Sequence, residues 1–368
     1  MIPETPNYVR LDSGIENRLL EAGLDAPLWG ESEALEPTGR AFLNLIESCI
    51  GHVRGVDRVS VPVRFAVSRS HRAQAHAFHN DGAPFFVLTE GLASGLTALS
   101  RHLALSDWVF LEAPPESWIP RRPAFADRQA GLLHLFFGHC SLLAEADQAR
   151  STLISQTATT FIVMHELGHL VNGHLASGVY ASGAISETAA DADLDLALTR
   201  RALEYDADAF AVRHTLGVAS GLVGRSTFLG AETTPTQLVQ LVMIGIAVAQ
   251  LYFEAFDPGL DQPLSQRTHP PAWIRQFNAM AMFDAIHARD MKAPPWRDLE
   301  VQRLNELALL GREIALSDSG VPMMAEALGG GPAARTLLSQ FTHAVRARWL
   351  ELRPRLTAAK LGAHNLAL

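Results

Sequence analysis

The segment HELGH places two histidines four residues apart, with a glutamate directly after the first. On a helix this spacing puts His165 and His169 on one face, one turn apart, where both imidazoles can bind the same ion. Glu166 points about 100° away from His165, towards the expected place of a zinc-bound water, and could exchange a proton with that water. The three residues therefore predict a zinc site that hydrolyses peptide bonds.

The residues on both sides of this motif are apolar, with FIVM before it and LVN after it. A helix that is apolar nearly all round is expected to be buried, so its imidazoles and carboxylate need partners, and a zinc ion would supply one. His174 would lie about 140° round the helix from His169. We therefore expect His174 to have a structural role, or to support a zinc ligand, rather than to bind zinc.

A catalytic zinc ion usually has three protein ligands, so a third ligand must come from elsewhere. Two downstream segments offer a glutamate with an aspartate one turn later: Glu187 and Asp191 in SETAADAD, and Glu204 and Asp208 in ALEYDADAFA. In either segment the aspartate could orient a ligand histidine. Glu187 follows Ser186, a good helix N-cap, and an acid at a helix start is stabilising without any metal. A carboxylate in the middle of a buried helix needs a partner, so we favour Glu204 and keep Glu187 as the alternative.

Hydrophobic periodicity predicts the elements that carry these residues. Two strands are expected, at 59–67 and 83–89, and Pro62 suggests that the first lies at the edge of a sheet. Helical patterns cover 38–54, 92–105, 129–147, 150–176, 186–216, 236–256, 296–316 and 333–360. The sequence therefore predicts an α+β fold that is predominantly α-helical, with a small β-sheet near the N-terminal side.

The composition narrows the possible partners. The 368 residues are 48% hydrophobic and 19% charged, which is enough apolar surface for a large core. A net charge of −9 without a basic stripe disfavours a nucleic-acid partner. Two cysteines, Cys49 and Cys140, and the lack of a secretory pattern at the start predict a cytoplasmic protein. The apolar segment 238–253 contains Gln240 and Gln250 and is shorter than a bilayer span of about 20 residues, so we expect a core helix and no membrane insertion.

HELGH followed by EYDAD resembles the gluzincin metallopeptidases, whose two motifs are HExxH and ExxxD. EYDADAFA is similar to a helix of the peptidase family that includes HtpX and the CAAX prenyl endopeptidase. HAFHNDGAPFFVLTEGL and THPPAWIR are similar to two further segments of that family, so the resemblance spans 76–275. It implies a zincin-like fold, with the active-site helix and the glutamate helix beside the sheet. It also implies a zinc metalloendopeptidase that binds Zn²⁺ through His165, His169 and Glu204, with Glu166 as general base.

The same resemblance implies roles for residues outside the two motifs. Asp208 would orient a ligand histidine. His269 and Arg275 would return near the metal, where they could hold the substrate or the developing oxyanion. The strand 84–89 would be a sheet edge that pairs with the extended backbone of a peptide or protein substrate. His76 stands where the family usually has asparagine.

The chain is predicted to form a metallopeptidase domain over 1–280, with an insertion at about 106–147, and a C-terminal helical extension over 281–368 packed on it. These added segments could cap the cleft and gate the enzyme. One alternative is a catalytically silent, zinc-stabilised regulatory or interaction module, although such a module has no use for Glu166 as a general base. Another is a peptidase dedicated to one cytoplasmic protein target, which a looser similarity to the phage-exclusion peptidase Lit implies. The cleavage specificity and the oligomeric state stay open.

Overall fold

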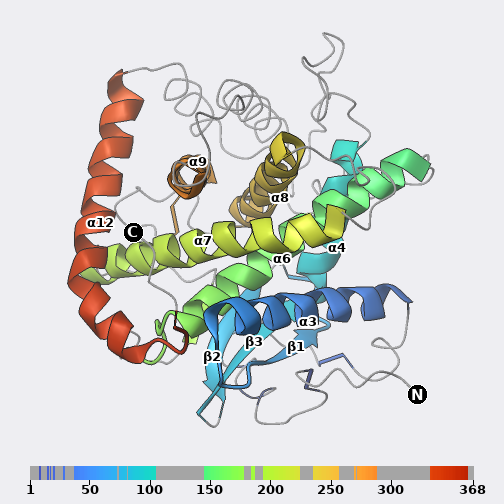
Figure 1. The fold of residues 1–368 in the computed structure, drawn as a ribbon, viewed down its shortest axis with the longest axis horizontal. Coiled ribbons are helices and arrows are strands. Elements are labelled where there is room, and N and C mark those ends of the chain that lie inside the picture. The colour runs from blue at the N-terminus through green and yellow to red at the C-terminus, as the bar shows by residue number, and fades with distance from the viewer. Residues whose placement is uncertain are drawn as a thin grey trace.

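Helices make up most of the structure, a computed structural model in which 37–72, 74–80, 82–104, 145–177, 184–186, 194–223, 235–256, 269–270, 272–287, 332–363 and a few N-terminal residues are described. The helices are α3 (Pro37–Asp57), α4 (Glu90–Ala104), α6 (Glu145–Val171), α7 (Leu194–Val223), α8 (Pro235–Phe256), α9 (Ala272–His287) and α12 (Pro332–Ala359). The strands are β1 (Arg64–Ser68), β2 (Ala75–Asn80), β3 (Ala83–Thr89) and β4 (Ala184–Ser186). The predicted fold class, α+β and predominantly α-helical, is confirmed (Figure 1).

Helices α6 and α7 lie side by side in the middle of the molecule and carry the predicted site (Figure 1). They approach closely at Gly168, where an added Cβ would lie 3.1 Å from Cα of Ala207 and 3.3 Å from Cβ of Phe210. A side chain at Gly168 would therefore push the two helices apart. Helices α4 and α8 pack against α6, and α9 packs against α7 and α8. The HELGH helix is thus enclosed by other helices, as its apolar sequence predicts.

The strand predicted as a substrate-binding edge lies inside the sheet instead. The strand order is β1-β3-β2-β4, and β3 pairs with β1 in parallel and with β2 in antiparallel register. The prediction for 84–89 is therefore wrong, because β2 was not foreseen and pairs along that side of β3. Gly82, with φ of 78°, lies in the tight turn between β2 and β3. The outer strands are β1, as Pro62 suggested, and the short β4.

The two faces of the sheet contact different parts of the chain. Phe65, Ala77 and Phe86 belong to the large core shared with the helices. The residues that alternate with them, including Phe78 and Phe85, pack with N-terminal residues on the opposite face. His76 alternates with Ala77 along β2 and so shares the face of Phe78, away from the helices.

Several element boundaries differ from those predicted. Helix α6 ends at Val171 rather than near 176, because the chain turns at Gly173, with φ of 80°. Ser186 belongs to β4, and the described part of α7 begins only at Leu194, so Ser186 does not cap the described helix. Helix α9 was not predicted. The predicted insertion and helix 296–316, together with Glu187, Asp191 and Cys140, fall largely or wholly outside the described residues.

Helix α8 contains the apolar segment that was predicted to be a core helix. Its residues Val242, Ile246 and Ala249 are buried, and the Tyr252 hydroxyl donates a hydrogen bond to the carbonyl oxygen of Gly91 at 2.8 Å. Among the described helices, none combines the length and hydropathy that a membrane crossing requires. The prediction of a buried helix at 238–253 is therefore confirmed for its described side chains.

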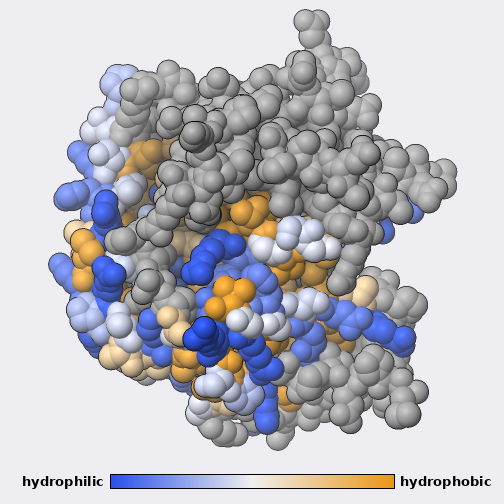
Figure 2. All heavy atoms as spheres, viewed as in Figure 1, coloured by the Kyte–Doolittle hydropathy of each residue, from blue (hydrophilic) through white to orange (hydrophobic). Residues whose placement is uncertain are grey.

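Helix α12 packs across one end of α7 (Figure 1), and its buried and exposed side chains lie on different sides of the helix. Hydrophilic residues predominate on its outer side at the left of Figure 2. Arg348 donates a hydrogen bond to Thr199 and forms an ion pair with Asp195, both on α7. Beyond the helix, the backbone amide of Leu361 bonds to the carbonyl oxygen of Val171 at 2.8 Å. The buried side of α12 consists of Phe341, Val345, Trp349, Leu352 and Leu356.

Candidate metal centre

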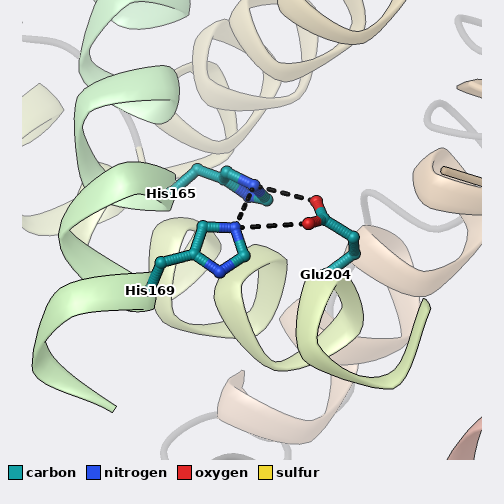
Figure 3. A group of neighbouring side chains, drawn as sticks. All are labelled: His165, His169 and Glu204. Atoms are coloured by element: carbon teal, nitrogen blue, oxygen red, sulfur yellow. Dashed lines mark hydrogen bonds and ion pairs between the residues drawn. The ribbon is translucent and has the colours of Figure 1, made fainter. Parts of the chain in front are cut away.

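His165, His169 and Glu204 lie together between α6 and α7, and all three are buried (Figure 3). The Nε2 atoms of the two histidines are 3.0 Å apart. The Glu204 carboxylate faces both, with Oε2 3.0 Å from Nε2 of His165 and Oε1 3.3 Å from Nε2 of His169. The structure thus brings together the three residues that the sequence predicts as zinc ligands, whereas the alternative Glu187 is outside the described residues.

The other nitrogen of His165 is held by a buried ion pair. Nδ1 of His165 lies 2.9 Å from Oδ1 of Asp208, and the Arg275 guanidinium donates two hydrogen bonds to the same carboxylate, at 2.7 and 2.9 Å. Burial raises the pKa of Asp208, but Arg275 and His165 outweigh it, so the pKa is below its usual value. An ionised Asp208 accepts a hydrogen bond from the Nδ1–H group of His165, which leaves a lone pair on Nε2 facing Glu204.

Arg275 is placed differently from its predicted role. Its side chain is 5% exposed, and its Nε and Nη2 atoms both donate to Asp208. A guanidinium held in this way orients Asp208, and through Asp208 it orients His165. This geometry favours a positioning role for Arg275 over direct contact with a substrate.

A second chain of polar groups lies behind His169. Its Nδ1 is 2.8 Å from Nδ1 of His174, and Nε2 of His174 is 3.0 Å from Oδ2 of Asp206. Asp206 also accepts hydrogen bonds from Asn172 at 2.6 Å and from Trp349 at 2.9 Å. His174 therefore contacts the predicted ligand His169, as expected for a supporting residue. The helical angle that was used to exclude His174 as a zinc ligand does not apply, because α6 ends at Val171.

Asp206 and Trp349 were missed by the sequence reasoning. Asp206 lies within EYDAD, two residues from each of the two acids that the ExxxD pattern selects. This position beside the predicted ligand was the one feature of the sequence that pointed to Asp206. Trp349 is 143 residues from Asp206, and no local pattern connects the two.

The charge balance of the three-residue group favours a bound cation. Burial lowers the pKa of His169 to about 4, so this imidazole is neutral near pH 7. Burial raises the pKa of Glu204, but His269, His169 and His165 outweigh it, and the pKa lies well below its usual value. Two nitrogen lone pairs and a carboxylate thus face one another in a buried space, which is costly unless a cation lies between them.

The spacing of these atoms fits zinc. Ligand atoms at 2.0–2.1 Å from a tetrahedral zinc ion are about 3.3 Å from one another. The observed separations of 3.0 and 3.3 Å are close to this value. Two imidazoles and one carboxylate are also a common ligand set of catalytic zinc. The described residues therefore fit the metal that the sequence predicts.

Two further predicted residues lie at or next to this group. Nε2 of His269 is 3.6 Å from Oε2 of Glu204, and the His269 side chain, 11% exposed, is more accessible than the three predicted ligands. Glu166 is buried on α6, directly after His165. His269 thus reaches the predicted metal site from the segment before α9.

Comparison with known proteins supports peptidase chemistry. Residues 136–293 match the family model described as Peptidase U49, a Lit-like family of metallopeptidases. The match spans a little under half of the chain, contains HELGH, EYDAD and THPP, and ends before α12. It supports the looser similarity to Lit and does not extend to the segment 76–92 used for the likeness to HtpX and the CAAX prenyl endopeptidase. No curated protein and no solved structure matches the chain.

Proposed function

We propose that this protein is a zinc-dependent metalloendopeptidase. The observation that carries the proposal is the buried group of His165, His169 and Glu204, whose facing atoms have the separations of zinc ligands. The match to a peptidase family over the same part of the chain supports it. Bound zinc supplies Lewis-acid chemistry, since it polarises a peptide carbonyl and makes water more acidic.

Glu166 is the proposed general base and acid. It takes a proton from the attacking water, whose oxygen forms a bond with the carbonyl carbon of the substrate. When the carbon–nitrogen bond breaks, Glu166 gives the proton to the leaving amine, and the products are a carboxylic acid and an amine. Its place beside His165 on α6 and its burial suit this task, because a buried carboxylate is shielded from bulk water.

His269 is the proposed donor to the substrate oxygen. It lies at the predicted metal site and is partly exposed, so a substrate carbonyl at the site would come within its reach. A donor aimed at the oxygen on which negative charge develops stabilises the transition state. Arg275 does not contact the substrate in this proposal; it holds Asp208 in place against His165.

The proposed substrate is a peptide or a protein. Looser similarity to Lit, together with the family match, favours a peptidase dedicated to one protein target over a broad digestive enzyme. If an extended substrate pairs with the sheet, β4 is the outer strand on the β2 side, since β3 is enclosed.

Substitution of Glu166 by glutamine tests the catalytic role. We expect Glu166→Gln to retain bound zinc and to lose about 10²–10⁴-fold in the rate of peptide cleavage, because glutamine cannot exchange the proton. Zinc content is measured by atomic absorption, and cleavage is measured on casein and a peptide library. Glu351→Gln makes the same chemical change at an exposed position of α12 and should leave both quantities unchanged.

The outcomes separate the enzyme from the silent module. Equal cleavage rates for Glu166→Gln and wild type would show that Glu166 is not the general base. Wild type that binds one zinc ion, cleaves none of the peptides and produces no cleavage in cells that is absent with Glu166→Gln would favour the zinc-stabilised interaction module. Wild type that binds no zinc would contradict the metal centre itself.

A further inference from the structure

The chain of groups behind His169 reaches from the predicted metal site to the C-terminal helix. It runs from His169 to His174, then to Asp206 of α7 and to Trp349 of α12, through separations of 2.8, 3.0 and 2.9 Å. All four side chains are buried. We call these four residues the His174 relay.

With an uncharged His174, the hydrogen bonds of the relay fix the places of its protons. Asp206 accepts hydrogen bonds from Asn172 and Trp349, so it also accepts the bond from His174, whose proton then sits on Nε2. A neutral His174 offers a lone pair at Nδ1, and His169 must donate from its own Nδ1. Nε2 of His169 is left as a lone pair directed at His165 and Glu204. The relay therefore selects the tautomer of His169 that can bind a metal.

A local turn brings His174 into this position. The helix ends at Val171, Gly173 adopts a left-handed conformation with φ of 80°, and the amide of His174 bonds to the carbonyl oxygen of His169 at 3.2 Å. This six-to-one bond is the mark of a Schellman helix end. It folds His174 back beside His169, which a continuing helix would not do.

The C-terminal helix holds the far end of the relay in two ways. Trp349 is buried against α7 and donates its indole N–H to Asp206. The end of α12 also packs on the same helix end, since an added Cβ at Gly173 would lie 2.6 Å from the carbonyl carbon of Ala359. Both contacts come from a helix beyond the residues that match the peptidase family.

We propose that His174, Asp206 and Trp349 are positioning residues for the metal ligand His169, so that helix α12 helps to set the affinity of the site for zinc. This inference rests on the zinc site of the proposed function. It assigns a task to a helix for which the family match offers none. Loss of an outer partner of a ligand histidine typically weakens metal binding by about 10–100-fold.

The test compares zinc affinities, measured for the full chain by competition with a chromophoric chelator. We expect Asp206→Asn to raise the zinc dissociation constant about 10–100-fold, and Trp349→Phe to raise it several-fold, because phenylalanine keeps the ring but loses the N–H donor. The cobalt-substituted protein provides a second readout, since its visible absorption bands should shift in both variants when the orientation of His169 relaxes.

Phe341→Leu is the matched control for Trp349→Phe. Phe341 is a buried aromatic residue of α12, and its ring lies beneath Arg201 of α7, outside the relay. The control should lower the free energy of unfolding and leave the zinc dissociation constant within about twofold of wild type. A role that is merely structural would change the zinc affinity of both variants equally.

Three results would overturn the inference. Wild-type zinc affinity in both Asp206→Asn and Trp349→Phe would show that the relay does not act on the metal, while the proposed peptidase would stand. If Phe341→Leu and Trp349→Phe weaken zinc binding equally, the effect comes from the packing of α12 and not from the hydrogen bond of Trp349. Absence of zinc binding by wild type would remove this inference and the proposed metal centre together, whereas zinc binding without peptidase activity would contradict only the proposed function.

Discussion

His165 and His169 lie one helical turn apart and face the same point, but the groups behind them differ in charge. His165 contacts the carboxylate of Asp208 directly, and that carboxylate is paired with Arg275. His169 contacts the imidazole of His174, and a carboxylate, Asp206, comes only one step later. One ligand is therefore held by a buried ion pair and the other by a chain of hydrogen bonds.

The two supports have a common origin in α7. Along this helix each step of two residues turns the direction of the side chain by about 200°, so Asp206 points away from Glu204. Asp208, two steps from Glu204, returns to within about 40° of it and lies on the same face. Glu204 faces both histidines, Asp208 reaches His165 and Asp206 reaches the helix end that carries His174. A single segment, EYDAD, thus supplies one predicted ligand and the carboxylates that hold both histidines.

The largest effect is expected from breaking the ion pair. Asp208→Asn removes the carboxylate that accepts two hydrogen bonds from the buried guanidinium of Arg275, and removing one partner of a buried ion pair costs about 3–5 kcal/mol. The measurement is urea unfolding of the metal-free protein. Asp195→Asn is the control on the same helix, because Asp195 is 74% exposed and its pair with Arg348 should be worth less than about 1 kcal/mol.

A double variant checks the physical cause. Replacing Arg275 by methionine in the Asp208→Asn protein removes the buried charge that has lost Asp208 and should recover much of the lost stability. If Asp208→Asn alone is no more destabilising than Asp195→Asn, the pair carries no buried charge and the contrast between the two supports disappears.

Local spacing was enough to predict that His165 and His169 share one helix face, because they are only four residues apart in sequence. Glu204 was favoured over Glu187 by its place in the middle of a buried helix, and the resemblance to the gluzincins implied the same choice. The sheet order was not predictable in the same way. It depends on β2, a short segment with two histidines and no strong alternation, and on its pairing with β4 more than a hundred residues later. The end of α6 was signalled by Gly173, but the apolar residues around it favoured a longer helix.

An intermediate effect is expected at Asp206. Asparagine offers one acceptor oxygen and one NH₂ group, so at least one of the donors His174, Asn172 and Trp349 would face another donor. We expect Asp206→Asn to lower the free energy of unfolding by about 2 kcal/mol, because an unsatisfied buried donor costs about 1–3 kcal/mol. This is less than for Asp208→Asn, since no fixed positive charge loses its partner. Equal losses in urea unfolding would mean that His174 carries a charge, and the two supports would then be alike.

The smallest effect is expected at Asn172, which donates one of the three hydrogen bonds to Asp206. Asn172→Ala leaves Asp206 with His174 and Trp349 as donors, so we expect a loss of about 1 kcal/mol in urea unfolding. The same substitution in the Asp206→Asn protein isolates the contact, because the loss should shrink when the carboxylate is already absent. If Asn172→Ala lowers the free energy of unfolding equally in the Asp206→Asn protein, the effect comes from the end of helix α6 and not from the contact with Asp206. His174 and Trp349 would then be the partners that stabilise Asp206.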